Sequence, residues 1–570
     1  MPGFERSNRI LVRKFIQYLI PTMITTAAIS LNEFVDSMLA ASLLGSKAMA
    51  VITLGTPTAM LLAGIYTLLG NGGATLYASC LGSRETVRAG RCFRASMITA
   101  LIAGIAVPVL GFSFFNEIAS LLCRNDELMP DFIAYFRIQL YSAPLLVFVL
   151  TLVEFFTPSG KPSFATAVIT TANGVNLIMD YVYMGVLNMG VQGAAWATFT
   201  GYVAGLGLIA LFYITGRLKI RYSVGETLDV LRDAGKIGAS PALSQLSFAP
   251  RYAVTNALAA YWGGTAGIVA FSLCCQMLSV VSIFLAAILG TSVPLVAVLH
   301  GQKDYIGKAY VLSVALKAQL VMSVICIAFA EIFAEGFAAI YSINDPAELE
   351  MSVKALRIFS LMFLFRSAYM VIMKYWQASG KNLASFVISM LDGFAGIIPI
   401  MFVMSMVMGI TGIWWGYVLN SVLILAGTAL YFVKLKPSSG DDSSFFEATI
   451  ILESESISGV TAKLEDICRR AGADASLSLR SALALEEIAV YTRNHIKKDS
   501  YMDITARSYP DRIEIDFRTL GEPFDPMSET IYDMPENMKF LRSLSPLIEH
   551  DYIMGMNCTR ISITKRGDKR

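Results

Sequence analysis

The stretch that decides the fold reads PTMITTAAISLNEFVDSMLAASLLG, from Pro21 to Gly45. It is longer than the twenty or so apolar residues that a helix needs to cross a bilayer. It nevertheless carries two carboxylates, Glu33 and Asp36, which share a helix face because they are three residues apart. Carboxylates at membrane depth are costly and usually face a bundle interior or a water-filled cavity. The alternative, a carboxylate near the membrane surface or between two helices, stays open, more so for Glu33 than for Asp36.

The composition is that of a polytopic membrane protein. Of 570 residues, 55% are hydrophobic and 15% are charged, whereas soluble domains carry about a quarter charged residues. The eight cysteines form no CxxC pair, which indicates neither a disulfide framework nor a metal site. The formal net charge of +2 points to no charged partner, and we expect no nucleic acid among the partners.

We predict twelve membrane spans, near residues 15–43, 50–80, 93–115, 132–156, 163–186, 190–215, 237–261, 267–299, 309–333, 352–377, 383–408 and 411–433. Basic residues gather in the loops on one side of these spans, and acidic residues dominate on the other side. Because cytoplasmic loops carry the excess of Lys and Arg, both termini are predicted to be cytoplasmic. We therefore expect a multi-pass protein of the cell inner (cytoplasmic) membrane, embedded in the lipid bilayer.

The chain repeats itself at an offset of 219 or 220 residues. The matched anchors are Pro21 with Pro241, Asp36 with Asn256, SGK at 159–161 with SGK at 379–381, GSRE from Gly82 with GQKD from Gly301, and GVQGAAW from Gly190 with GITGIWW from Gly409. Six spans per unit is an even number, so both copies enter the membrane in the same direction. Parallel repeats of this kind are typical of transporters whose substrate binds between the halves.

After Lys436 the composition becomes polar. We predict a first six-helix lobe at 1–220, a second at 221–436, a linker at 437–444 and a cytoplasmic α+β domain at 445–570. The fold class is thus an all-α polytopic membrane protein of twelve helices in two parallel repeats, followed by a small soluble domain. Within that domain we predict strands near 446–453 and 559–565, helices near 456–471 and 475–497, and a hairpin of 501–508 with 512–519, whose alternating pattern is typical of a half-buried sheet.

Polar residues form a stripe on the fifth predicted span. Asn173, Asn176 and Asp180 are spaced i, i+3 and i+7, so they lie on one helix face, and Thr198 follows on the next span. Together with Asp36 they form an all-oxygen group that suits Na⁺, or a proton shared between two carboxylates. The alternative is a polar network that only holds the helices together. We favour a coupling site, because intramembrane acids are usually functional.

The second half lacks this stripe. Asn256 replaces the acid of the first span, and Gly396 and Ile400 replace Asn176 and Asp180. Arg251 is expected to face the first span across the cleft, where it would pair with Glu33, contact an anionic substrate or form a stabilising salt bridge. Three further charged residues near span ends are predicted to reach water at the membrane surface: Glu154, Arg366 and Asp392.

The internal repeat, Pro21, Asp36 and the segments NGVNLIMD and GVQGAAWAT together match the pattern of a known family. Through these features, residues 10–434 resemble the MATE family of multidrug and toxic compound extrusion transporters. The resemblance implies two six-helix lobes and antiport of cations or drugs driven by Na⁺ or H⁺. In the branch that couples through the first lobe, it implies a cation site at four residues here: Asp36, Asn176, Asp180 and Thr198. Members that couple through the second lobe use acids that this chain lacks, which favours the first-lobe branch. Glu33 and Arg251 are not part of this pattern.

The tail resembles the histidine-kinase-like ATPase fold of anti-sigma-factor serine kinases, through LALEEIAVY (483–491), LGEPFDP (520–526) and GMNCTRISITK (555–565). Glu487 stands at the general-base position, but Tyr491 replaces the Mg²⁺-binding Asn. Thr519, two residues before Gly521, replaces the adenine-binding Asp, and the glycine-rich lid has become ENMKFLRSLSP. These losses remove the groups that hold Mg-ATP. We expect a degenerate, non-catalytic domain that binds a cytoplasmic protein partner or senses a ligand.

The function that follows is a secondary exporter of small organic compounds, cationic or amphipathic, with no cofactor other than Na⁺ or H⁺ as coupling ion. One alternative is a flippase for a lipid-linked or anionic substrate, for which Arg251 and a basic cavity would be needed. Another is a membrane sensor that signals through the tail. None of the three is an enzyme.

Overall fold

The computed structural model describes residues 6–44, 48, 51–52, 54–123, 128–216, 222–340, 346–434, 445–496, 500–509, 511–526, 536–544 and 547–565. The chain divides into two compact units, Gln17–Lys434 and a smaller one that combines Met1–Ile16 with Leu435–Arg570. The first sixteen residues were predicted to belong to the first lobe, whereas the structure groups them with the tail. The predicted linker, 437–444, lies outside the described residues.

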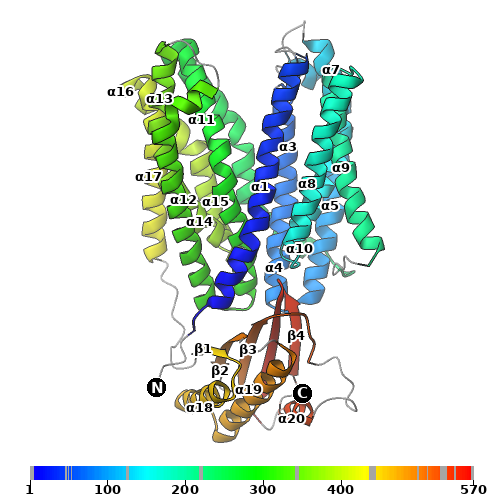
Figure 1. Ribbon diagram of the computed structural model, residues 1–570, viewed down its shortest axis with the longest axis vertical. Helices are drawn as coiled ribbons and strands as arrows, with labels where there is room; N and C mark the ends of the chain where they lie inside the picture. Colours follow the sequence, from blue (N-terminus) through cyan, green and yellow to red (C-terminus); the bar gives the residue numbers. More distant parts are fainter. Residues whose placement is uncertain are drawn as a thin grey trace. The chain divides into compact units, whose positions relative to one another are not determined.

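The larger unit is helical (Figure 1). Its first half comprises α1 (Arg9–Leu44), α3 (Thr56–Tyr66), η1 (Thr67–Asn71), α4 (Gly72–Gly82), α5 (Thr86–Ser113), α6 (Phe115–Leu122), α7 (Met129–Glu154), α8 (Pro162–Asp180), η2 (Tyr181–Val186) and α9 (Val191–Ile214). Its second half comprises α10 (Leu228–Leu246), α11 (Phe248–Gly301), α12 (Tyr305–Ile340), α13 (Pro346–Ser360), α14 (Met362–Ala378), α15 (Asn382–Met390), η3 (Leu391–Ala395), α16 (Ile397–Met408) and α17 (Ile410–Lys434). The segments marked η are single stretches of π-helix.

Nine helical stretches within the described residues are long and apolar enough to cross a membrane. One of them, Leu228–Gly301, is interrupted at Gly264, where φ is +57° and the backbone leaves the helical region. Glycine is suited to this position because it has no Cβ to clash at positive φ. The break falls between the seventh and eighth predicted spans. The count of twelve spans stays a prediction.

The same backbone conformations recur in the two halves. Positive φ angles occur in three pairs 219 or 220 residues apart: Arg84 (66°) with Lys303 (58°), Gly160 (81°) with Gly380 (76°), and Gly190 (63°) with Gly409 (61°). These shared local conformations support the predicted internal repeat.

The two halves meet closely through glycines. A Cβ built on Gly82 of α4 would collide with the carbonyl oxygen of Val298 in α11, and one on Gly301 would collide with the carbonyl oxygen of Ser79. Backbone atoms cannot move aside as a flexible side chain can. The glycines therefore allow α4 and α11 to approach more closely than any other residue would at these positions.

The smaller unit contains a five-stranded antiparallel sheet in the order β1-β2-β3-β5-β4. The strands are β1 (Phe445–Ile451), β2 (Tyr501–Ser508), β3 (Arg512–Leu520), β4 (Leu547–Ile553) and β5 (Met556–Thr564). Helices α18 (Ser454–Arg470) and α19 (Ala475–His495) cover one face, as Figure 1 shows, and α20 (Glu536–Leu544) adds Met538 and Leu541 to the same core. The predicted helices and hairpin lie where the structure has them, while α20 and β4 were missed.

The chain's first described residues belong to this sheet unit. The guanidinium of Arg6 pairs with Glu447 on β1 at 3.2 Å, and the backbone N–H of Ser7 donates to Oγ1 of Thr449 at 2.9 Å. Arg9 donates to the hydroxyl of Tyr501 on β2. These contacts join residues 6–9 to the edge strand β1 and its neighbour, 441 residues further along the chain for the Arg6 pair.

Candidate functional site

A cluster of polar side chains lies in the first half of the helical unit, where α1 and α8 come together. Asp36 projects from α1, and Asn176 and Asp180 project from α8. Asn176 is 5% exposed and Asp180 is 1% exposed. The structure thus unites three of the four predicted coupling residues in a buried site. The one-face spacing on α8 and the acid on α1 were sufficient signals to predict it.

Asn32 completes this cluster and was missed by the sequence reasoning. Its side-chain amide donates to Oδ2 of Asp36 at 2.9 Å and to Oδ1 of Asn176 at 2.8 Å. Asn32 therefore bridges the two helices with one amide nitrogen. The signal was available, because Asn32 stands four residues before Asp36 and so shares its helix face.

The carboxyl groups of Asp36 and Asp180 lie within hydrogen-bonding range of each other. A carboxylate has no donor, so a hydrogen bond between two carboxyl groups requires a proton on one of them. Within the described residues, Oδ1 of Asp36 and Oδ2 of Asp180 are buried without a partner. The partly buried ring of Tyr135 on α7 is close enough to interact electrostatically with both carboxyls. Nothing in the sequence distinguished Tyr135 from the other aromatic residues.

Three predicted residues are placed differently. Thr198 on α9 donates to the carbonyl oxygen of Ala194 in its own helix at 3.1 Å. The buried amide nitrogen of Asn173 has no partner among the described residues. Glu33 lies within α1, but its side chain is outside the described part of the structure, so its predicted pairing with Arg251 is not addressed.

The backbone around the cluster explains how α8 and α9 approach each other. Gly201 of α9 faces α8, where a Cβ would lie 2.9 Å from Cβ of Asn176. Immediately after Asp180 the helix widens into the π-helical turn η2. Such turns are rare and are frequently found at functional sites.

A second buried cluster surrounds Asp392 in η3, in the other half of the unit. The guanidinium of Arg366 on α14 contacts both carboxylate oxygens, at 3.3 and 3.1 Å, and Tyr369 donates its hydroxyl to Oδ1. Arg251 on α11 lies 3.8 Å from Oδ2 and donates to the backbone carbonyl of Asp392 at 3.3 Å. The prediction that Asp392 reaches water at the membrane surface was wrong, since its side chain is 8% exposed, whereas Arg366 is 21% exposed. Of the three roles expected for Arg251, the stabilising salt bridge is the one that agrees with its contacts to Asp392.

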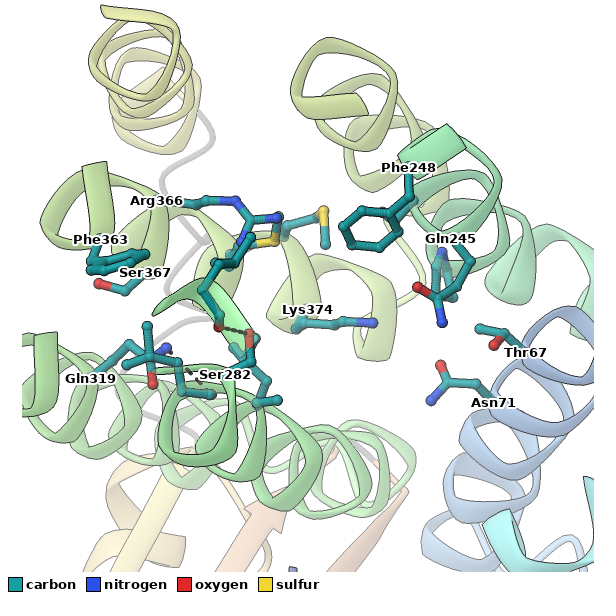
Figure 2. Close-up of a pocket in the computed structure, with 18 residues that line it drawn as sticks. Thr67, Asn71, Gln245, Phe248, Ser282, Gln319, Phe363, Arg366, Ser367 and Lys374 are labelled. Carbon is teal, nitrogen blue, oxygen red and sulfur yellow. Dashed lines mark hydrogen bonds between the residues drawn. The ribbon is translucent and has the colours of Figure 1, made fainter. Parts of the chain in front are cut away.

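Beside this second cluster is a cavity of about 310 Å³. Figure 2 shows Thr67 and Asn71 from the first half on one side, and Arg366 and Lys374 of α14 from the second half. The lining residues are Thr67, Asn71, Pro241, Ser244, Gln245, Phe248, Leu278, Ser282, Leu285, Ala286, Leu289, Gln319, Phe363, Arg366, Ser367, Met370, Met373 and Lys374. None of the predicted first-half coupling residues is among them, and neither is Asn256, the repeat counterpart of Asp36, whose side chain is exposed on α11.

Lys374 takes part in a polar network that joins the two halves. Its ammonium donates to Oε1 of Gln377 at 3.1 Å, and the amide of Gln377 donates to Oδ1 of Asn71 at 2.7 Å. Asn71 hydrogen-bonds Glu154 at the end of α7, whose charge acts on Lys374. Glu154 therefore has partners inside the helical unit while its side chain is partly exposed.

In the sheet unit, aromatic rings surround Tyr491, the residue that the resemblance aligns with a Mg²⁺-binding Asn. Tyr491 stacks on His495 with ring centroids 4.1 Å apart, and Phe524 stacks on His495 at 5.8 Å. Thr519 is buried, and Gly521 adopts a φ of +149° after β3. Burial and the neighbouring Glu486 raise the pKa of Glu487. The segment that would form a lid is instead the helix α20, packed into the core.

Comparison with known proteins adds evidence for the helical unit. A family model described as MatE matches residues 21–182 and 241–402, two segments that begin 220 residues apart. The multidrug export protein MepA of Staphylococcus haemolyticus is 23% identical over 441 residues, which cover 76% of this chain and 94% of the relative. MepA of Staphylococcus aureus is 22% identical over 456 residues, covering 78% and 98%.

Two solved structures share the fold. One is an outward-facing multidrug resistance MATE family transporter of the MOP superfamily, with a TM-score of 0.70 and 20% identity over 75% of this chain and 96% of the other. The second is a MOP superfamily transporter from Pyrococcus furiosus, described by the reverse polarity of its binding pocket. Its TM-score is 0.69, with 20% identity over 74% of this chain and 95% of the other.

Proposed function

Because this chain belongs to the MATE family, and so is a membrane transporter, we propose that it exports small amphipathic organic compounds in exchange for H⁺ or Na⁺ bound at Asp36 and Asp180. The observation that carries this proposal is the contact between the carboxyl groups of Asp36 and Asp180, beside the hydrogen bonds by which Asn32 links Asp36 to Asn176. Two acids in contact inside a membrane helix bundle are expensive unless their protonation is used.

The geometry supports a proton as the coupling ion. Protonation of one carboxyl lets it donate to the other, whereas two ionised carboxylates at this separation repel each other. Loss of the proton therefore favours separation of α1 from α8, and that change in packing alters the affinity of the transporter for its substrate. Substrate must weaken proton binding by the same factor, since coupling between two sites is reciprocal.

Sodium is the second candidate. Its ligands would be three buried oxygens that have no partner among the described residues, Oδ1 of Asn32, Oδ1 of Asp36 and Oδ2 of Asp180, because Na⁺ prefers oxygen. Oδ1 of Asn176 already accepts a hydrogen bond from Asn32, and the amide nitrogen of Asn32 also occupies one Asp36 oxygen. Fewer oxygens therefore remain for a cation than the sequence had suggested.

Transport by the full chain in proteoliposomes tests the proposal. Ethidium and a panel of other dyes are followed under a pH gradient and, separately, under a Na⁺ gradient. Asp36→Asn keeps the size of the side chain but removes its titration, and it should abolish transport driven by the coupling ion. The control is Asp233→Asn, a carboxylate paired with Arg88 at 2.9 Å and 38% exposed, which should transport normally. Undiminished ion-driven transport by Asp36→Asn would refute the coupling role.

For the sheet unit we propose a regulatory role without catalysis. The stacked Tyr491, His495 and Phe524 support this, because they place rings where a nucleotide-binding member has a metal ligand. A cytoplasmic protein partner is the proposed ligand, and both termini are proposed to be cytoplasmic in a bacterial-type inner membrane. A sensor that signals through this unit remains the alternative from another functional class.

A further inference from the structure

The charges that face the cavity are of one sign. Among the described residues that line it, the ionisable ones are Arg366 and Lys374, two cationic side chains eight residues apart on α14. No carboxylate is in that lining. Figure 2 shows Lys374 extending into the middle of the cavity, with Asn71 and Thr67 beyond its amine and Arg366 on the other side.

Asp392, which is not among the residues that line the cavity, does not cancel the charge of the two arginines that contact it. Asp392 neutralises one guanidinium, yet both Arg366 and Arg251 contact it, at 3.1 and 3.8 Å. One positive charge is therefore in excess in that cluster. The Arg366 side chain is 21% exposed while Asp392 is 8% exposed, so the guanidinium presents itself to the cavity and the carboxylate does not.

Lys374 is placed to bind a ligand. Its ammonium has three N–H donors, and the donor described above goes to Gln377 at 3.1 Å. Glu154 acts on Lys374 across the boundary between the two halves, but Glu154 itself is not a lining residue. An anionic group entering the cavity would meet the ammonium directly, with the amide groups of Asn71 and Gln245 nearby.

We propose that this cavity binds amphipathic organic anions, whose anionic group pairs with Lys374, a specificity-determining residue, and is further stabilised by Arg366. The apolar part of the ligand would contact the Phe248, Met370 and Met373 side chains, and thioethers adapt readily to differently shaped ligands. Charges of one sign in a cleft with low-dielectric walls concentrate ligands of the opposite sign. A cationic drug in the same place would instead meet two like charges. This inference rests on the proposed export function and narrows its substrate class.

Binding of the anion would also change the polar contacts between the two halves of the helical unit. Lys374, Gln377, Asn71 and Glu154 form a continuous polar chain from α14 to α7. An anion on Lys374 replaces Glu154 as the counter-charge of the ammonium. The network then loses an electrostatic interaction between the halves at the moment when the cavity is filled.

Binding is measured without any ion gradient, on the purified full chain in detergent, by fluorescence anisotropy with carboxyfluorescein as the anionic probe and ethidium as the cationic one. Wild-type protein should bind carboxyfluorescein. Lys374→Gln should weaken that binding by about tenfold or more, because hydrogen bonds to charged groups contribute on that order. Ethidium binding should be unchanged or tighter. Lys374→Arg keeps the charge and should restore most of the affinity for carboxyfluorescein.

Three controls keep the result interpretable. Lys236→Gln removes a lysine whose side chain is 54% exposed and lies outside the cavity lining, and it should leave both probes unaffected. Elution of each variant as a monodisperse peak excludes misfolding. The double variant with Lys374→Gln and Glu154→Gln leaves no buried charge without its partner, and it should still bind carboxyfluorescein weakly. Equal carboxyfluorescein affinity in wild type and Lys374→Gln, or no binding by wild type, overturns the proposal.

Failure of this inference is distinguishable from failure of the export function. Ion-driven transport of ethidium without carboxyfluorescein binding contradicts only the anionic substrate class. Binding of carboxyfluorescein that depends on Lys374, without ion-driven transport of either dye by wild-type protein, contradicts only the export function.

Discussion

Asp392 is the buried carboxylate that pairs with two guanidinium groups, those of Arg251 and Arg366, in the second half of the helical unit. Arg366 and Arg251 both contact it, and Tyr369 donates to it. Removal of its charge would leave the guanidinium groups in a low-dielectric site with no counter-charge. Breaking a buried ion pair from one side is far more destabilising than breaking a pair on the surface.

Asp392→Asn should therefore lower the stability of the helical unit, by about 3–5 kcal/mol. The measurement is the apparent unfolding temperature of the full chain in detergent, compared with wild type. Asp233→Asn is the matched control, because its partner Arg88 is 33% exposed, and exposed pairs contribute about 0–1 kcal/mol. An unfolding temperature of Asp392→Asn equal to that of Asp233→Asn would show that the cluster does not stabilise the fold.

For individual residues, the sequence predicted the cluster around Asp36 better than the cluster around Asp392. Asp36, Asn176 and Asp180 were predictable because two of them share a helix face and all are polar within apolar helices. The partners of Asp392 come from two other helices, α11 and α14, and no spacing along the chain brings them together. The position of Arg366 and Asp392 near predicted span ends suggested contact with water, but the pairing of charges allows Asp392 to be buried.

Among the helices, the contact between α4 and α11 depends on backbone approach. Gly82 and Gly301 each face a carbonyl oxygen of the other helix. A side chain at Gly82 cannot be accommodated by a rotamer change, because the obstacle is backbone. The two helices would have to separate, and they belong to the two halves whose relative movement is expected in alternating access.

Gly82→Leu should hold this end of the helical unit open. Cys80, which is 2% exposed on α4, should then react faster with a membrane-impermeant maleimide, as detected by mass spectrometry of the labelled peptide. Gly427→Leu is the control, since nothing lies within 4 Å of a Cβ at that position. Unchanged labelling of Cys80 in Gly82→Leu would show that the close approach of α4 and α11 does not govern access.

The π-helical segments are the elements that no periodicity predicted. η1 ends at Asn71 on the cavity, η2 begins after Asp180, and η3 contains Asp392. A π-helical turn has the same composition as an α-helical one, so apolar patterns do not reveal it. It forms because the surrounding helices favour the position that it gives to a side chain.

For the whole molecule, the sequence predicted a helical membrane part and an α+β tail. Alternating residues in 501–508 and 512–519 were enough to predict the hairpin, since one face of the sheet is packed by α18 and α19. The strand β4 was missed because it lies at the sheet edge and its burial does not alternate. The grouping of residues 6–9 with the tail depends on contacts over 441 residues, which no local pattern encodes.

Deletion of residues 440–570 distinguishes between the two proposed functions of the whole molecule, an exporter and a sensor. A transporter whose tail only regulates should keep ion-driven dye transport in proteoliposomes and keep its dependence on Asp36. The shortened chain needs to elute as a monodisperse peak, and the full chain with Lys539→Ala, an exposed substitution on α20, serves as the control. Complete loss of transport from a well-folded shortened chain would favour a signalling role for the tail.

The contacts of residues 6–9 with the sheet can form only late in the synthesis of the chain. Arg6 and Arg9 emerge from the ribosome 441 or more residues before Glu447 and Tyr501 are available to them. At about 5–20 residues per second, that interval is on the order of half a minute. During it both arginines are free of the tail and can act as the basic residues that orient the first helix during insertion. Afterwards the same side chains contact the sheet, so under the predicted orientation one short basic segment would serve first in membrane insertion and later in completing the fold.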